Sequence, residues 1–238
     1  MRRKLRLLGS VLAVMGLLAV AWSLVVWQWQ DPFTALYTLW KQHQLAAQYA
    51  KRASAFRATA PADSSLAAER RDVAAEATTY RLETHRGEAI GRIVVPRMGL
   101  NMILVDGTDH DSLTKGPGRD LVSYMPGENR LVYIAGHRTT YLAPFSHIDL
   151  MRKGDPITLK LPYGKFFYRV SGQRIVPAND LAVLRSPRHE LLILQACHPR
   201  FFATHRFLVY AQLVHVDPRG GTPYDLAAAA ALSQTSRK

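Results

Sequence analysis

The sequence predicts an all-β fold, a barrel or a sandwich, and two features of the chain lead to this prediction. The first is a series of short segments rich in β-branched and aromatic residues, separated by turn signals such as Met125-Pro126-Gly127 and Lys153-Gly154-Asp155. The second is that nothing between these segments has the length and period of a helix. The predicted strands are 90–96, 101–107, 130–136, 155–161, 165–176, 191–196 and 206–216. We place the barrel domain at residues 88–216.

The N-terminus predicts a membrane anchor. Residues 7–27 carry no charge, and this length suffices for an α-helix to cross the hydrocarbon core. Four basic residues lie within the first six, and the first charge after the stretch is Asp31. The positive-inside rule then puts residues 1–6 in the cytoplasm, a transmembrane helix at 7–29 and the rest of the chain outside the cell. Ala19-Val20-Ala21 resembles a signal-peptidase site, so a cleaved signal peptide is the alternative, but the apolar stretch continues beyond it.

Two further helices are predicted between the anchor and the barrel, at 34–58 and 66–84. The second carries Leu66, Val73 and Tyr80 on one narrow stripe. We expect residues 30–87 to be an extracellular spacer, and the alternative is a regulatory segment packed on the domain. Residues 217–238 open with Asp-Pro-Arg-Gly-Gly and end in an alanine run with a basic tip, which predicts a flexible tail.

The net charge of +13 suggests an anionic partner, such as lipid headgroups or a cell-wall polymer. The basic residues do not form a stripe interleaved with aromatics, and the chain contains no nucleic-acid-binding motif, so we expect no nucleic-acid partner. Neither HExxH nor CxxC spacing occurs, so we expect no metal and no cofactor.

Cys197 is the only cysteine, and in an exported protein a single cysteine cannot form an intramolecular disulfide. It is therefore either a buried, inert thiol or a reactive one, and the residues alone leave both open. A reactive thiol needs a base or an electropositive neighbour and a donor for an oxyanion. His137 at the end of strand 130–136 and Arg206 at the start of strand 206–216 are candidates. His198 is adjacent to Cys197, but successive residues of an extended chain point to opposite sides.

The segments GPGRDLVSYMPGENRLVYIAGHRTTYLAPFSHIDLMRKGDPITL and LLILQACHPRFFATHRFLVYAQL resemble the sortases, most closely the class E housekeeping sortases of high-GC Gram-positive bacteria. The resemblance covers residues 88 to about 216 in order, and it implies a closed β-barrel of about eight strands with short helices. It implies a catalytic His137, a nucleophilic Cys197 and an Arg206 that binds the oxyanion or substrate. Substrate contacts are expected from Ala196, Thr139 and His198.

The resemblance also implies a reaction and its partners. The thiolate of a sortase attacks the Thr–Gly bond of a C-terminal sorting signal on an exported protein, here of LAXTG or LPXTG type, and forms a thioacyl-enzyme. An amine nucleophile such as lipid II then resolves this intermediate. The sequence departs from the family at 193–197, where Ile-Leu-Gln-Ala-Cys replaces the usual T-L-x-T-C. The missing hydroxyl at Ala196 is expected to affect signal preference and rate.

Two alternatives stay open beside the transpeptidase hypothesis. One is a non-catalytic envelope-binding or assembly module on the same fold, because a fold does not fix a function. The other is an L,D-transpeptidase, whose nucleophile stands in an S-H-G-C context that differs from Gln195-Ala196-Cys197-His198.

Overall fold

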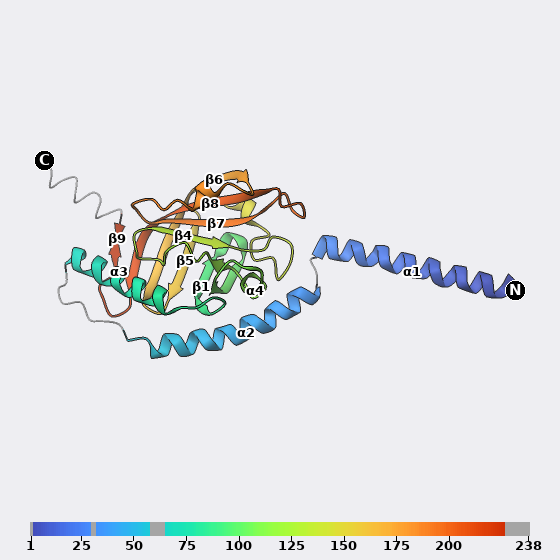
Figure 1. Cartoon of the computed structure of the whole chain (residues 1–238), viewed down its shortest axis with the longest axis horizontal. Coiled ribbons are helices and arrows are strands. Elements are labelled where there is room, and N and C mark those ends of the chain that lie inside the picture. Colours follow the sequence, from blue (N-terminus) through green and yellow to red (C-terminus); the bar gives the residue numbers. More distant parts are fainter. Residues whose placement is uncertain (1, 30–31, 58–64, 227–238) are drawn as a thin grey trace.

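The computed structural model describes residues 2–29, 32–57 and 65–226, and Figure 1 shows its arrangement: a β-barrel, two helices packed on it, and a long helix that projects away. Within these residues the chain forms nine strands. They are β1 Ala89–Val95, β2 Leu100–Asp106, β3 Gly118–Arg119, β4 Leu131–Ala135, β5 Pro156–Leu161, β6 Gly164–Pro177, β7 Leu191–His198, β8 His205–Pro218 and β9 Tyr224–Asp225.

The strands close into a barrel, which confirms the predicted fold class. Their order is β6-β5-β1-β2-β3-β4-β7-β8, and β6 pairs with β8 to complete the ring. The pairs β2–β3 and β4–β7 are parallel and the others are antiparallel. Alternate side chains of the strands point inward and form one large apolar core. Closure leaves β9 as a short addition on β8.

All seven predicted strands are present, and two short strands were not predicted. β3 consists of Gly118 and Arg119, too short for any period to be visible in the sequence. It is held by a buried ion pair, in which Nε of Arg119 donates to Oδ1 of Asp106 on β2 at 2.8 Å. β9 is equally short and pairs with β8 at His215 and Val216.

The helices agree closely with the predicted ranges. They are α1 Arg2–Trp29, α2 Pro32–Ala55, α3 Leu66–Glu83 and the short α4 His110–Leu113, with 3₁₀ turns η1 Pro96–Met98, η2 Ile148–Leu150 and η3 Leu181–Leu184. In α1 the window Arg6–Ser23 is long and apolar enough to cross a membrane, and no part of it is buried. Ser65 caps α3 by accepting a hydrogen bond from the amide of Ala68.

The helices α2 and α3, in the segment expected to be a spacer, both pack on the barrel. Val73, Ala77 and Tyr80 of α3 are buried in the main core, where their i, i+4, i+7 spacing forms a continuous apolar stripe. Leu45 of α2 packs in a separate cluster with Ile103 of β2 and its neighbours. The stripe is narrow, yet it is enough because small alanines let α3 approach closely.

The tail predicted to be flexible is part of the fold over its first ten residues. β8 continues to Pro218, β9 follows, and the amide of Thr222 donates to the buried Glu69 carboxylate of α3 at 2.9 Å. Residues 227–238 lie outside the described residues. The folded domain therefore extends beyond 216 and includes residues up to at least 225.

Candidate active site

Three neighbouring strands, β4, β7 and β8, bring the predicted site residues together at one rim of the barrel. β7 pairs antiparallel with β8, and Cys197 lies directly opposite Arg206. β4 pairs parallel with β7, with Ala135 opposite Gln195. His137 stands two residues beyond Ala135, just as Cys197 stands two residues beyond Gln195. The topology therefore places His137, Cys197 and Arg206 in one row across three adjacent strands.

Cys197 belongs to the series of β7 side chains that face away from the barrel interior. Leu192, Leu194 and Ala196 are buried in the main core, whereas Ile193 packs in a second apolar cluster. Because side chains alternate along a strand, Cys197 shares the outer face with Ile193, and it is half-buried. A thiol in this position is held by the sheet and remains accessible to a substrate.

The same alternation corrects the expectation for Ala196. Its side chain is 0% exposed and lies among the barrel's core residues. A side chain at this position cannot touch a substrate on the outer face, so the expected substrate contact of Ala196 has no support in the structure. A hydroxyl here would point into the apolar interior.

His137 lies beside a tyrosine ring that in turn contacts a second histidine. Its ring centroid is 5.1 Å from that of Tyr141, which in turn is 6.1 Å from that of His110. Burial, with the nearby His110 as a smaller cause, lowers the pKa of His137 below its ordinary value of 6.5. Its Nε2 is buried and has no hydrogen-bond partner among the described residues. A buried ring nitrogen without a protein partner is unusual.

Arg206 is half-buried and donates through Nη1 to two carbonyls of its own turn, those of Ala203 at 2.8 Å and His205 at 3.0 Å. These bonds tie the guanidinium to the β7–β8 connection beside Cys197. Thr139, the third expected substrate contact, lies in the loop that follows His137 and is also half-buried.

Arg138 is a site residue that sequence reasoning missed. It is only 6% exposed, although it follows His137 directly and lies in a loop. Its Nη1 lies 3.0 Å from Nδ1 of His198 and 3.4 Å from the carbonyl oxygen of Cys197. Its Nη2 pairs with Asp149 at 3.1 Å. One buried guanidinium therefore connects the loop after β4 to the backbone of the cysteine.

His198 lies on the side opposite Cys197, as the alternation of an extended strand predicts. Its ring is engaged by Arg138 and lies 6.0 Å from the ring of Phe207, whose side chain packs with the main core. This places His198 in the support of the loop, and the expected substrate contact of His198 has no support in the structure.

Comparison with known proteins decides the family. The Sortase domain model matches residues 93–214, slightly more than half of the chain. The chain belongs to the sortase family. Sortase D of Bacillus subtilis is 33% identical over 147 residues, covering 60% of this chain and 72% of the relative. Sortase SrtE1 of Streptomyces coelicolor is 28% identical over 95 residues, covering 36% of this chain and 27% of the relative.

A solved structure agrees with the barrel. The sortase D5 transpeptidase of Clostridium perfringens superimposes with a TM-score of 0.59 at 21% identity, covering 73% of this chain and 98% of the other. At this identity the likeness speaks for the fold. Sortases are cysteine transpeptidases, so family membership makes Cys197, the only cysteine, the focus of the site.

The outer face of β4, β7 and β8 carries the second apolar cluster of this sortase, which leads up to the row of three residues. Its buried members are Leu131, Tyr133, Val176, Ile193 and Leu208. Val183 and Leu184 of η3, in the β6–β7 connection, pack against it. The hydroxyl of Tyr133 lies 3.4 Å from Oε1 of Gln195, two residues before Cys197. A buried apolar cluster, covered by η3, thus lies on the same face of the sheet as the thiol and holds these strands in place.

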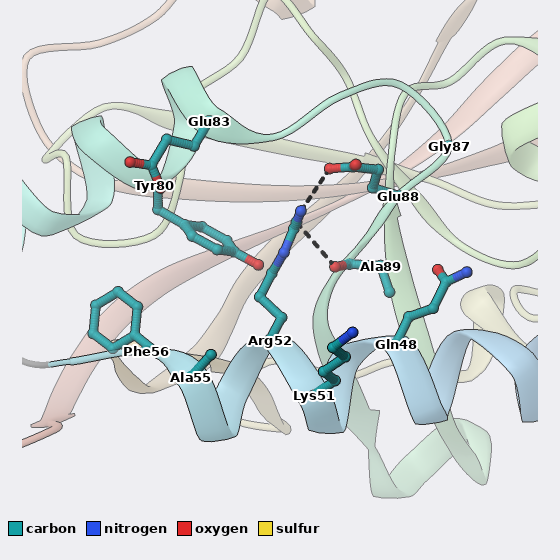
Figure 2. A pocket seen from close by; sticks show the side chains of 10 residues that line it. All are labelled: Gln48, Lys51, Arg52, Ala55, Phe56, Tyr80, Glu83, Gly87, Glu88 and Ala89. Atoms are coloured by element: carbon teal, nitrogen blue, oxygen red, sulfur yellow. Dashed lines mark hydrogen bonds and ion pairs between the residues drawn. The ribbon is translucent and has the colours of Figure 1, made fainter.

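Several cavities of the described residues lie away from this row. One of 710 Å³ lies between α2, α3 and the start of β1, and its Arg52 is bonded to Glu88 and to the carbonyl of Ala89, as Figure 2 shows. These polar groups satisfy one another, and none belongs to the row at the rim. Within the described residues no three His, Cys, Asp or Glu side chains gather closely enough to hold a metal ion.

Proposed function

We propose that this sortase is a membrane-anchored cysteine transpeptidase with Cys197 as nucleophile, His137 as acid and base, and Arg206 as oxyanion and substrate ligand. The observation that carries the proposal is the row of these three residues on adjacent strand ends, on the face of the barrel away from its core. Each residue has the chemistry that its role requires, and the described geometry supports the order of the steps.

In the first half-reaction His137 accepts the proton of the Cys197 thiol, and the resulting thiolate attacks the carbonyl carbon of the threonine in a Thr–Gly bond. The carbonyl oxygen becomes an oxyanion, which a cationic donor stabilises. Arg206 serves because its guanidinium keeps its charge and cannot act as an acid. The C–N bond then breaks, the glycine amine leaves with a proton from His137, and the threonine acyl group stays on sulfur.

In the second half-reaction an amine attacks the thioester carbon. His137 accepts the proton of the attacking amine, the new C–N bond forms, and the C–S bond breaks to return the thiolate. The unpartnered Nε2 of His137 supports this shuttle, since no described residue competes for it.

The substrate we propose is a C-terminal sorting signal of LAXTG or LPXTG type on an exported protein, with a cell-wall amine such as lipid II as acceptor. Thr139, half-buried in the loop after His137, is a proposed contact for the signal beside Cys197. Class E, with its LAXTG-like signal, remains our proposal. The match to sortase D extends over 72% of that relative, whereas the match to sortase E1 extends over 27%, so the assay includes both LAXTG and LPXTG peptides.

We further propose that α1 anchors the enzyme, with residues 1–6 in the cytoplasm, α1 across the membrane and the barrel outside. The charge-free stretch and the basic residues before it support this orientation. The helical segment before the barrel and the barrel itself then form the extracellular part, close to exported substrates and cell-wall precursors.

The test is a ligation assay on the full chain in detergent, with LAXTG and LPXTG peptides and a glycine-based amine. We expect ligated product from the wild type, none from Cys197→Ala, and losses of about 10²- to 10⁴-fold in His137→Ala and Arg206→Ala. His205→Gln, a change of an exposed histidine beside Arg206, is the matched control and should keep activity.

Product formation by Cys197→Ala would refute the proposal. A wild type that forms no product, and whose thiol is slow to alkylate and is unprotected by peptide, would favour a non-catalytic binding module on the same fold.

A further inference from the structure

α2 has two faces of opposite character. Its inner face is fixed to the barrel: Oγ1 of Thr38 donates to the carbonyl of Thr114 at 2.8 Å, and Gln42 bonds to both the amide and the carbonyl of Ile103. Leu45 packs farther along the same face. This half of the helix is therefore part of the domain and cannot rotate to bury anything else.

The outer face of the first turns carries large apolar side chains that the described residues leave exposed. They are Phe33 (72% exposed), Leu36 (69%), Tyr37 (41%), Leu39 (55%) and Trp40 (54%), here called the aromatic face. Positions 33, 36, 37 and 40 follow the helical period and share one side. A contiguous exposed apolar surface of this kind marks an interaction site.

The aromatic face is confined to the start of α2. The same side of the helix continues with His43, Gln44, Ala47, Gln48 and Lys51, which are exposed and mostly polar. A partner helix or a second copy lying along α2 would favour an apolar stripe over its whole length. The partner surface therefore meets α2 only at its first turns.

The chemistry of the aromatic face matches a membrane interface. Tryptophan and tyrosine are enriched at the headgroup level, and lysine there extends its ammonium group towards water. Nζ of Lys41 lies 4.5 Å from the ring centroid of Trp40 and 5.7 Å from that of Tyr37. The apolar bodies and the cationic tip thus stand side by side.

The position of the aromatic face in the chain also indicates the membrane interface. α1 ends at Trp29 and α2 begins at Pro32, so the aromatic face follows closely after the helix that holds the candidate span Arg6–Ser23 (Figure 1). The ring of Phe33 lies 5.9 Å from that of Trp22 on α1. If α1 crosses the membrane, the first turns of α2 are held at the depth where the hydrocarbon meets the headgroups.

We propose that the aromatic face of α2 is seated in the outer headgroup region of the membrane that α1 spans, with lipid as its partner. The inference rests on the proposed anchoring by α1. It has a consequence for the site, because Oγ1 of Thr34, in the first turn, accepts a hydrogen bond from the amide of Tyr141 at 3.2 Å. Tyr141 packs on His137, so the seated helix holds the His137 side of the row near the membrane surface.

The experiment measures depth with nitroxide labels on the full chain in vesicles of phosphatidylcholine and phosphatidylglycerol. Cys197→Ala removes the native thiol, and Leu36→Cys and Trp40→Cys supply two independent label positions. Ala47→Cys is the matched control, because it lies two turns beyond Trp40 on the same side of the helix. Collisions with oxygen, which concentrates in lipid, are compared with collisions with a water-soluble nickel chelate.

We expect labels at 36 and 40 to lose accessibility to nickel and gain accessibility to oxygen relative to the label at 47. Equal nickel accessibility at all three positions would overturn the inference. Protection from both reagents together with spin–spin broadening between molecules would also overturn it, in favour of a second copy. No activity is measured, so a failed ligation assay and a failed depth assay are distinct results. Release of the protein by a carbonate wash would overturn the anchoring and this inference with it.

Discussion

The loop beside the nucleophile depends on one buried arginine, and replacing it tests how the site is held. Arg138→Met keeps the length of the side chain and removes its charge and its donors. The change takes away the 3.0 Å contact with His198, the 3.4 Å bond to the Cys197 carbonyl and the 3.1 Å ion pair with Asp149. It also removes the guanidinium from the face of Phe207, where it lies 5.8 Å from the ring centroid.

The magnitude follows from these contacts. A hydrogen bond from a charged donor contributes about 1.5 to 3 kcal/mol, and the longer bond to Cys197 belongs at the low end. The cation–π contact adds about 1 kcal/mol, and the ion pair, whose Asp149 side chain is 42% exposed, adds at most about 1 kcal/mol. Relief of the buried charge offsets part of the sum. A net loss of about 2 kcal/mol would lower Tm by about 4 to 8 °C.

The effect on activity should exceed the effect on folding at assay temperature. Loss of the Arg138 bridge frees the backbone of Cys197, and misplacement of a reacting group by about 1 Å costs about 10²-fold in rate. We therefore expect kcat for peptide ligation to fall about 10- to 100-fold with KM nearly unchanged, because Arg138 is itself buried behind the row of reacting residues. Arg138→Lys should recover little, since a single ammonium group cannot reach His198, Cys197 and Asp149 together.

Asp149→Asn is the matched control, because it removes the partly exposed ion pair and leaves the contacts with the nucleophile's loop. It should change kcat by no more than about threefold. The reasoning fails if Arg138→Met lowers Tm as expected while kcat stays at the wild-type value, because Arg138 would then stabilise the fold without positioning the thiol. Full recovery of kcat in Arg138→Lys would refute the argument from guanidinium geometry.

Three further predictions concern buried groups. Burial raises the pKa of Glu190 from 4.5 to about 7, so its contribution to stability is greatest below pH 4.5 and is lost as the pH rises through 7. From pH 5 to pH 8 the free energy of unfolding of the wild type, measured by denaturant titration, should therefore fall by about 2 to 3 kcal/mol relative to that of Glu190→Gln. The same pH dependence in both proteins would contradict this prediction. Ala196→Thr puts a hydroxyl into the barrel core, so it should destabilise the fold by about 1 to 3 kcal/mol, measured as a lower Tm. The ratio of kcat/KM for LAXTG and LPXTG peptides should stay unchanged. A changed ratio would show that residue 196 affects substrate selection. The His137 ring should titrate below pH 6.5 in an NMR pH series, and Tyr141→Ala should move its pKa upward by exposing the ring to water; an unmoved pKa would assign the burial to other residues.

Much of the fold could be predicted because its elements carry local patterns. The strands are bounded by turn residues, and α3 shows its buried stripe through Val73 and Tyr80. β3 could not be predicted, because two residues carry no period and their pairing depends on the ion pair of Arg119 with Asp106, thirteen residues away. The packing of α2 on the barrel depends on polar contacts such as that of Gln42 with Ile103. Contacts of this kind leave no apolar pattern in the sequence, so they could not be predicted from it.

The candidate site was only partly predictable for a related reason. Residue types and strand ends were enough to propose His137, Cys197 and Arg206. The side on which each neighbour lies depends on register, and register is a property of paired strands. Ala196 therefore turned out to face the core, and Arg138 acquired a role only when the fold brought it to His198, sixty residues away.

The register also explains why residues adjacent in sequence have different roles in this site. Two rows cross the same three strand ends, and successive residues alternate between them. The outer row holds His137, Cys197 and Arg206, and the inner row holds Arg138, His198 and Phe207, whose side chains contact one another. The inner row connects the three strand ends from behind, so it limits how far the outer residues can move apart. On β7 and β8 one alternation therefore supplies both the reacting groups and their support, and Arg138, in the loop after β4, joins that support through His198 and Phe207.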